Sequence, residues 1–362
     1  MKVLIIAHSI YPFSIGGIET HVYYLTKYLR NKGVTVKVIT KNGVISAINK
    51  KTLLKPPLFT EICNLLKENY DFLHIHGVPK LLSCAILLLL SKLRRRTVIW
   101  TPHGFIDNIF QKSVKGSIKH KLALLLMRVC ANKMFDRFIA VHPGQQEVFN
   151  RIGIKKNKIF FIPNGIPDHY FKNGDHMAFK NKYNLKDKKI ITFIGRLTPH
   201  KRVNDLIEVI NEIVKNYYKN VFLIIAGPDV NELKRLRELV KCKNILFLGQ
   251  ISEAQKLMLL DSTDIFVNPS SFEAFGLSLV ESMAKGIPVI SANNVGAMYV
   301  LDNGKYGLLY SIGNKKELLE RILYLIENPE DAKCIGKKGK ERALEFTWEK
   351  ILDLFLNTAY KV

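Results

Sequence analysis

Short apolar runs alternate with amphipathic segments along the first half of the chain. Residues 18–31 place Val22, Leu25 and Leu29 on one helical face, and Gly33 follows as a terminator. Buried strands that alternate with helices are typical of a parallel sheet covered by helices on both faces. The pattern predicts a doubly wound α/β domain with strands at 2–7, 34–40, 71–76, 97–101, 137–141 and 158–162.

A second series of apolar runs begins after the polar, basic segment 171–189. We therefore predict two domains, 1–172 and 173–345. In the last segment, about 346–362, apolar residues recur at helical spacing, and we expect this helix to cross back onto the first domain. The predicted strands of the second domain are 190–195, 221–227, 244–249, 264–270 and 287–291, and the apolar positions of the last helix are Trp348, Ile351, Leu352 and Phe355.

The composition is that of a folded protein in a reducing compartment. The 362 residues fit two domains, and 48% hydrophobic with 24% charged residues argues against disordered and fibrous classes. Five scattered cysteines without a C-x-x-C pair disfavour a disulfide framework and a structural zinc site. The longest uncharged apolar stretch, 81–91, is shorter than the ~20 residues of a membrane span, so we expect a core helix there and a cytoplasmic protein.

The net charge of +24 lies mainly in the first half. Residues 1–180 hold 28 Lys and Arg against 9 Asp and Glu, whereas 181–362 hold 27 against 22. This imbalance suggests an anionic partner for the first domain, and the candidates are a phosphorylated substrate, lipid headgroups and nucleic acid. Of these we do not expect nucleic acid, because the positive charge is diffuse and no basic stripe interleaved with aromatic residues is present in the sequence. Segment 110–133 combines lysines with an apolar helix, as in a helix on an anionic membrane or a core helix with solvated lysines.

Candidate chemistry lies in loops that follow predicted strands. Gly16 and Gly17 open the first helix, where backbone amides would attract phosphate, although a simple tight turn has the same pattern. In the second domain Arg196 follows a strand and Lys201 precedes the next helix. This pair could straddle a diphosphate, and the alternative is ordinary surface charge.

Two glutamates stand eight positions apart in "SFEAFGLSLVESMA". If a helix starts near Gly276, Glu281 lies inside it and Glu273 precedes it. A carboxylate within an apolar run is costly to bury unless it bonds something, and ribose hydroxyls would satisfy Glu281. The amides at Gly276 would offer a second anion site.

These motifs together resemble one enzyme family across nearly the whole chain. The motifs are "GGIETHVYYL" near the start, "TPHG" at 101–104, "IPNGI" at 162–166, "GRL" with Lys201, "IAGPD" at 225–229, "FLGQIS" at 247–252 and the E-x7-E block. Taken together, they resemble those of retaining glycosyltransferases of family 4. The resemblance implies the GT-B architecture: two Rossmann-like domains that face each other across a cleft, the first on the acceptor side and the second binding the donor.

The resemblance also implies roles for individual residues. His103, Arg196, Lys201 and Glu273 would be catalytic, with the two cations on the donor diphosphate, Glu273 beside the transferred sugar, and the histidine near sugar and acceptor. The sequence departs from the family pattern at Arg202, where glycine usually follows the lysine, and in "AGPD", which lacks a second glycine. The residues expected to bind the nucleotide-sugar donor are Gly16, Gly17, Gly227, Gly249, Phe275, Gly276, Leu277 and Glu281.

The expected activity is transfer of a hexosyl group from a UDP- or GDP-sugar to a glycan or lipid-linked acceptor, with retention and by a front-face mechanism. We expect no cofactor and no metal, because side chains supply the cations and no D-x-D stands at a strand end. A sugar-nucleotide epimerase or hydrolase of the same shape is the enzymatic alternative, and a basic nucleic-acid-binding protein, suggested only by the charge, is the non-enzymatic one. The enzyme is expected at the inner face of the membrane or free in the cytoplasm.

Overall fold

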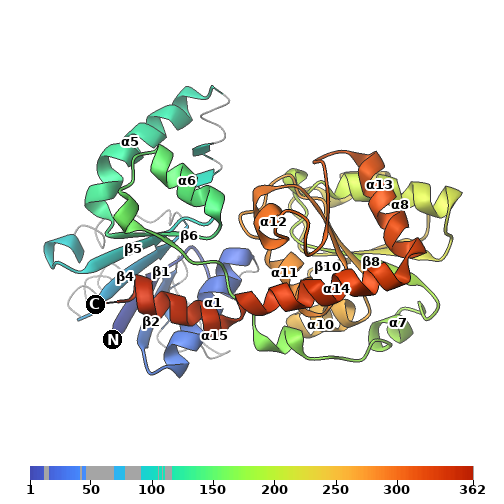
Figure 1. Ribbon diagram of the computed structural model, residues 1–362, viewed down its shortest axis with the longest axis horizontal. Coiled ribbons are helices and arrows are strands. Elements are labelled where there is room, and N and C mark those ends of the chain that lie inside the picture. The colour runs from blue at the N-terminus through green and yellow to red at the C-terminus, as the bar shows by residue number, and fades with distance from the viewer. Residues whose placement is uncertain are drawn as a thin grey trace. The chain divides into compact units, whose positions relative to one another are not determined.

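The computed structural model divides into two compact units (Figure 1). Unit 1 comprises Met1–Gly165 and Trp348–Val362, and unit 2 comprises Ile166–Thr347. The chain passes between them a few residues from the predicted positions 172 and 346. The predicted helix at 81–91 lies outside the described residues apart from its last position, as do Lys112 and Lys115. The structure describes residues 1–11, 16–40, 43–45, 69–77, 91–104, 106–107, 109–110 and 116–361.

Unit 1 is built on a seven-stranded sheet with the order β3-β2-β1-β4-β5-β6-β7. All neighbours are parallel except β2 and β3. The order runs outward in both directions from β1, which confirms the doubly wound prediction. Only β3 was not predicted, because three residues at a sheet edge carry too little periodicity. The strands are β1 Lys2–Ile6, β2 Thr35–Thr40, β3 Gly43–Ile45, β4 Phe72–His76, β5 Thr97–Thr101, β6 Arg137–Ala140 and β7 Ile159–Phe161.

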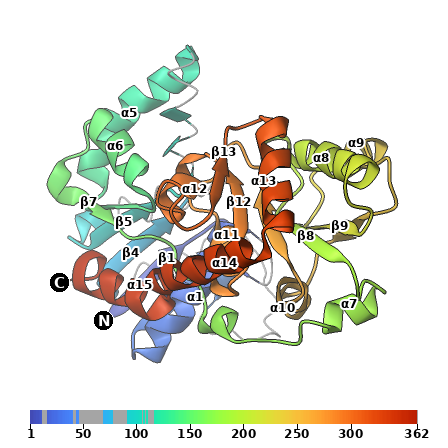
Figure 2. The same cartoon turned by 45° about the vertical axis from the view of Figure 1, so that its right-hand side comes forward.

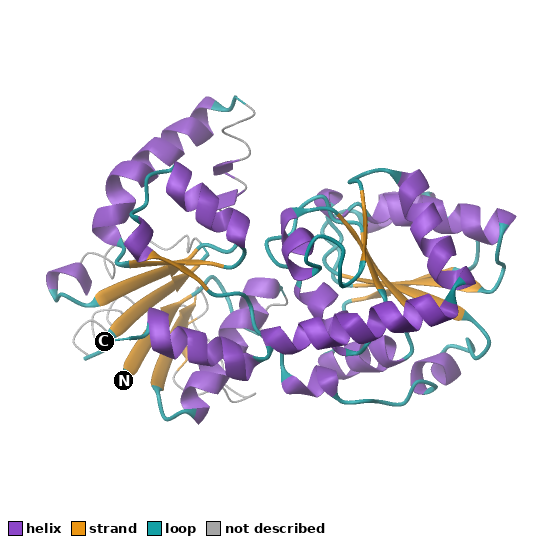
Figure 3. Ribbon diagram, viewed as in Figure 1, coloured by secondary structure: helices purple, strands orange, loops and turns teal. Residues whose placement is uncertain are grey.

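Helices cover both faces of this sheet (Figures 1 and 3). One face packs against α1 (Gly17–Asn31) and α15 (Trp348–Leu354), which a π-turn (Phe355–Ala359) continues. The other packs against α5 (Ile118–Met134) and α6 (Pro143–Arg151). The return of the C-terminal helix to the first domain is therefore confirmed. Its four predicted apolar residues, Trp348, Ile351, Leu352 and Phe355, are all buried in this core.

Unit 2 has a six-stranded, fully parallel sheet with the order β10-β9-β8-β11-β12-β13. The order again reverses beside the first strand, β8, so a switch point lies between β8 and β11. The five predicted strands are present, and the short β13 was not predicted. The strands are β8 Lys189–Ile194, β9 Val221–Ala226, β10 Ile245–Gly249, β11 Ile265–Asn268, β12 Val289–Ala292 and β13 Leu308–Tyr310.

Two helical layers enclose the unit 2 sheet. Figure 2 shows α8 and α13 on one side of the strands and α10 on the other. Successive residues of β8 divide between the layers, since Ile191 packs with α8 and Ile190 with α7 and α10. The helices are α7 Ala178–Lys182, α8 Val203–Asn216, α9 Leu233–Glu238, α10 Glu253–Asp261, α11 Leu277–Ala284, α12 Val295–Val300, α13 Lys315–Glu327 and α14 Pro329–Ala343.

Candidate active site

A cationic group lies at the carboxyl edge of β8 in unit 2. Arg196 is exposed in the loop that leaves the strand, and Lys201 ends the 3-10 turn Pro199–Lys201 before α8. Burial and the nearby charge of Lys201 lower the pKa of His200, Glu273 opposes this, and Arg196 lowers it further. The structure therefore brings Arg196, Lys201 and Glu273 within electrostatic range of one imidazole.

Lys201 and Glu273 form a direct, largely buried ion pair. The Ser270 hydroxyl lies 3.1 Å from the same carboxylate oxygen. An ammonium and a carboxylate held together at a strand edge can separate to meet a phosphate and sugar hydroxyls, respectively.

The loop that carries Glu273 is held by the start of α12. Asn294 caps that helix and donates from Nδ2 to the Ser270 carbonyl at 2.9 Å. The Gly296 amide donates to the Glu273 carbonyl at 3.1 Å. A Cβ on Gly296 would lie 2.7 Å from that oxygen and 2.9 Å from the Phe275 nitrogen, so the close approach requires glycine. Sequence reasoning missed these supports, because they come from a loop some twenty residues further along the chain.

Helix α11 begins beside this loop. Gly276 is its N-terminal cap with φ of 87°, a left-handed conformation that favours glycine, and Leu277 is its first residue. Phe275 points into the core against Tyr299 and Phe346, so only its backbone is available to a ligand. The helix therefore starts near Gly276, as the interpretation of the two glutamates assumed.

Glu281 is buried within α11 and binds Lys256 of α10. The Lys256 Nζ atom lies 3.0 Å from Glu281 Oε1 and 3.2 Å from Glu253 Oε2. Burial raises the pKa of Glu281, which Lys256 partly opposes. Glu253 also accepts hydrogen bonds from His169 and Tyr170. Burial raises the pKa of Glu253, but these two hydrogen bonds and the charge of Lys256 outweigh it, and the pKa falls to about 2. Glu281 thus pairs with a lysine that sequence reasoning did not single out.

The departure at Arg202 places a side chain on a left-handed backbone. Arg202 has φ of 50°, in the left-handed region where glycine is favourable. Its Nε donates to Asp205 Oδ2 at 2.7 Å. The extra cation is therefore tied to the first turn of α8.

Gly227 and Gly249, two of the residues expected to bind the donor, contact each other at the ends of β9 and β10. The Gly227 amide donates to the Gly249 carbonyl at 2.7 Å, and a Cβ on Gly227 would overlap the Gly195 carbonyl oxygen. Gly227 thus has a structural reason to be glycine. Gly249 is exposed, with φ of 65° and open space where a Cβ would stand.

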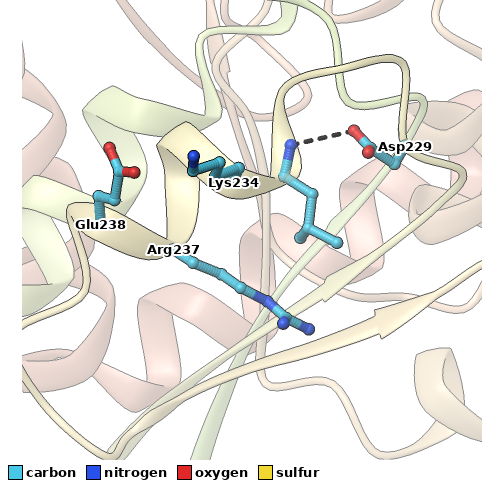
Figure 4. Close-up of a pocket in the computed structure, with 5 residues that line it drawn as sticks. Asp229, Lys234, Arg237 and Glu238 are labelled. Carbon is cyan, nitrogen blue, oxygen red and sulfur yellow. Dashed lines mark hydrogen bonds between the residues drawn. The ribbon is translucent and has the colours of Figure 1, made fainter.

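A shallow pocket lies beside this loop (Figure 4). Asp229 Oδ1 accepts from the Leu233 amide at 3.0 Å, which fixes the start of α9. The Arg237 guanidinium lies over the Phe247 ring, 5.9 Å from its centroid. The lining residues are Asp229, Leu233, Lys234, Arg237 and Glu238.

The remaining predicted residues belong to unit 1. Gly17 begins α1, and Gly16 precedes it with an extended backbone. His103 follows β5 with φ of 51° and is 4% exposed. Burial lowers its pKa to about 3, so its imidazole is neutral at pH 7. Its Nε2 lies 3.2 Å from His76 Nδ1, a neighbour that sequence reasoning missed.

Comparison with known proteins agrees with this architecture. Residues 15–170 match the family model described as Glycosyltransferase Family 4, and residues 175–342 match Glycosyl transferases group 1. An uncharacterized glycosyltransferase of Methanocaldococcus jannaschii is 30% identical over 97% of this chain and 95% of its own.

Two further proteins extend the comparison. N,N'-diacetylbacillosaminyl-diphospho-undecaprenol alpha-1,3-N-acetylgalactosaminyltransferase of Campylobacter jejuni is 28% identical over 91% of this chain and 87% of its own. The crystal structure of Anabaena HepE in complex with UDP and glucose superimposes with a TM-score of 0.78 at 20% identity, over 100% of both chains. The chain therefore belongs to the group 1, family 4 glycosyltransferases, is a transferase enzyme, and has the two-domain GT-B fold.

Proposed function

We propose that this enzyme transfers a hexosyl group from a UDP- or GDP-sugar to a glycan or lipid-linked acceptor, with retention of configuration. The observation that carries the proposal is the group of Arg196, Lys201 and Glu273 at the β8 edge. Ligands of open α/β sheets bind at the carboxyl ends of strands, near a switch point. In this proposal residues 173–345 bind the donor, and 1–172 with 346–362 face the acceptor.

The cations act on the leaving group. Arg196 and Lys201 neutralise the charge that develops on the diphosphate as the sugar–oxygen bond breaks. Amides at the start of α11, from Phe275 to Leu277, supply further donors for phosphate. Because side chains provide the positive charge, the transfer step needs no metal ion between the phosphates.

Retention follows from where the acceptor proton goes. The acceptor oxygen attacks the anomeric carbon on the face that the diphosphate leaves, and its proton passes to a departing phosphate oxygen. Glu273, bonded to Lys201 and near Ser270, holds hydroxyls of the sugar and is not assigned as a nucleophile. His103 is neutral, so it positions a hydroxyl by hydrogen bonding and carries no charge.

Ribose and base bind on the remaining loops. Glu281 accepts from the ribose hydroxyls, with the Lys256 ammonium 3.0 Å from its carboxylate. Backbone groups near Gly227 and Gly249 receive the base, and the solved neighbour that holds UDP supports a nucleoside diphosphate donor. Thermal-shift screening with UDP- and GDP-sugars tests the donor, because a ligand at 100 times its Kd adds about 2.7 kcal/mol to the free energy of unfolding.

The acceptor side points to a lipid-linked substrate. Ile118, Leu122 and Leu125 recur at helical spacing in α5 and are all more than half exposed, and Lys119 and Lys121 are exposed beside them. Such a face suits an anionic membrane surface. The Campylobacter relative, by its name, acts on an undecaprenol diphosphate glycan. None of the described helices is long and apolar enough to cross a membrane. On the basis of the α5 face, the proposal is peripheral binding at the inner face.

Two experiments test these assignments. A crystal soaked with donor should show the diphosphate on Arg196 and Lys201, and a diphosphate bound away from them would overturn the scheme. Flotation with anionic liposomes should recover the enzyme, and neutral liposomes should not. Failure to bind either would remove the membrane assignment alone. Release of an epimerised sugar nucleotide without acceptor would replace the transferase assignment.

A further inference from the structure

Three buried histidines from separate segments converge in unit 1. His21 comes from α1, His76 ends β4, and His103 follows β5. Their exposed fractions are 1%, 1% and 4%. Each offers a ring nitrogen within 4.8 Å of the others'.

The three rings form a nearly equilateral triangle. Ring centroids are 5.3 Å apart for His21 and His76, 5.2 Å for His21 and His103, and 5.4 Å for His76 and His103. With zinc–nitrogen bonds of about 2.0–2.1 Å and tetrahedral angles, three histidine ligands place their centroids roughly 5.2 Å apart. The rings therefore already have the spacing that one tetrahedral ion requires.

Hydrogen bonding leaves this cluster incomplete. Among the residues that the structure describes, neither ring nitrogen of His21 has a partner, nor has His76 Nε2. A buried polar atom without a partner costs about 1–3 kcal/mol. Neighbouring His74 differs, since its Nδ1 and Nε2 bond Tyr360 and Thr101 at 2.6 and 2.8 Å. Burial and the neighbouring histidines also lower the pKa of His21 and His76.

We propose that His21, His76 and His103 bind one divalent transition-metal ion of the zinc type. Imidazole nitrogens suit Zn²⁺ and Co²⁺ and do not suit Mg²⁺ or Ca²⁺. The 3.2 Å separation of His76 Nδ1 and His103 Nε2 suits two ligands of one ion as well as a hydrogen bond. The ion ties α1, β4 and the loop after β5 together, and water or a substrate hydroxyl takes the fourth position.

This site shares His103 with the proposed transfer chemistry, but its ion binding is measured separately from the transfer reaction. All three ligands belong to unit 1, whereas Arg196 and Lys201 belong to unit 2. Binding of a zinc-type ion therefore does not require donor, acceptor or turnover, and its measurement does not depend on whether the transfer mechanism is correct.

The test uses the full chain, freed of any affinity tag and stripped with a chelator. Zn²⁺ is titrated by calorimetry, and Co²⁺ by its visible absorption, which is strong when the ion is tetrahedral. His21→Gln and His76→Gln remove one ligand each. His142→Gln is the matched control, because His142 is as deeply buried and its ring nitrogens also lack hydrogen-bond partners among the described residues, yet it lies outside the cluster.

We expect one equivalent of Zn²⁺ and a tetrahedral Co²⁺ spectrum for the wild type and His142→Gln. Each ligand variant should lose more than the roughly 10–100-fold in affinity typical of outer-shell changes. Circular dichroism checks that the variants fold. Absence of a tetrahedral Co²⁺ spectrum in the wild type, which needs no variant, would overturn the proposal, as would equal affinity in the ligand variants.

Discussion

The chemistry proposed for this enzyme depends most on one side chain, Lys201. Its ammonium is largely buried and paired with Glu273, and Arg196 stands in the same loop region. The sequence predicted Arg196 and Lys201 as candidates because both residues follow a strand, and ligands of open α/β sheets bind at the carboxyl ends of strands. The pairing with Glu273, 72 positions away, is a product of folding.

Replacing Lys201 by Ala should reduce kcat by about 10²–10³, or about 3 kcal/mol of transition-state stabilisation, because a charge-stabilising donor is lost. Steady-state kinetics with donor and acceptor measures this. Lys219→Ala, at an exposed site in the same unit, should leave turnover unchanged. Near-normal turnover of the first variant, or its rescue by Mg²⁺, would contradict the mechanism.

Arg202 occupies a backbone conformation that glycine would adopt at lower cost. Its φ of 50° costs a side-chain-bearing residue about 1–2 kcal/mol. Arg202→Gly and Arg202→Ala lose the same bond to Asp205, but only glycine relieves the backbone. We expect the glycine variant to be more stable than the alanine variant by about 1 kcal/mol in denaturant unfolding. Equal stability of the two would show that the backbone is not strained.

At the scale of elements, the loop that carries Glu273 is held in place by hydrogen bonds from the start of α12. Helix α11 starts near Gly276, as the interpretation of the E-x7-E block assumed, but the supports of the loop come from the start of α12, and α10 is joined to α11. Lys256 of α10, between Glu253 and Glu281, joins its helix to α11. These contacts could not be predicted from one sequence, because they connect segments whose spacing in the chain carries no periodic signal.

Gly296→Ala should lower kcat/KM and destabilise the protein by about 1–3 kcal/mol, because the new methyl meets backbone atoms that cannot rotate away. Activity assays and denaturant unfolding measure both effects. Gly339→Ala in α14 is the control, since its Cβ would make only ordinary contacts, 3.4 Å or more from its neighbours. Full activity in Gly296→Ala would mean that the Glu273 loop does not depend on this contact.

At the scale of the whole molecule, the two units carry different charges and different titrating groups. Unit 1 holds the buried histidines and both tryptophans, Trp100 and Trp348, so tryptophan fluorescence reports on this unit. Burial lowers the pKa of His74 and His103 to about 3, and the charge of His103 adds to the shift of His74.

Acid should therefore destabilise unit 1 before carboxylate protonation becomes important. Each of His74 and His103 binds a proton when unit 1 unfolds, since the unfolded pKa is about 6.5. Its stabilising contribution is complete above pH 6.5 and is lost, at about 1.4 kcal/mol per pH unit, as the pH falls toward 3.

Denaturant unfolding followed by fluorescence between pH 7 and 4 measures this dependence. His74→Gln should reduce the slope by about 1.4 kcal/mol per pH unit, whatever its effect at pH 7. A slope that is the same in wild type and variant would show that His74 is not held neutral in the folded state.

The sequence alone determined the two doubly wound sheets, the return of the C-terminal helix and the loops where chemistry is expected. Periodicity, glycine positions and charges at strand ends are local properties, so they can be identified in a single sequence. Tertiary structure decided the partners: Lys256 for Glu281, Asn294 and Gly296 for the Glu273 loop, and His21 and His76 for His103. Burial and pairing arise only when distant segments meet, so they follow from packing and not from the order of residues.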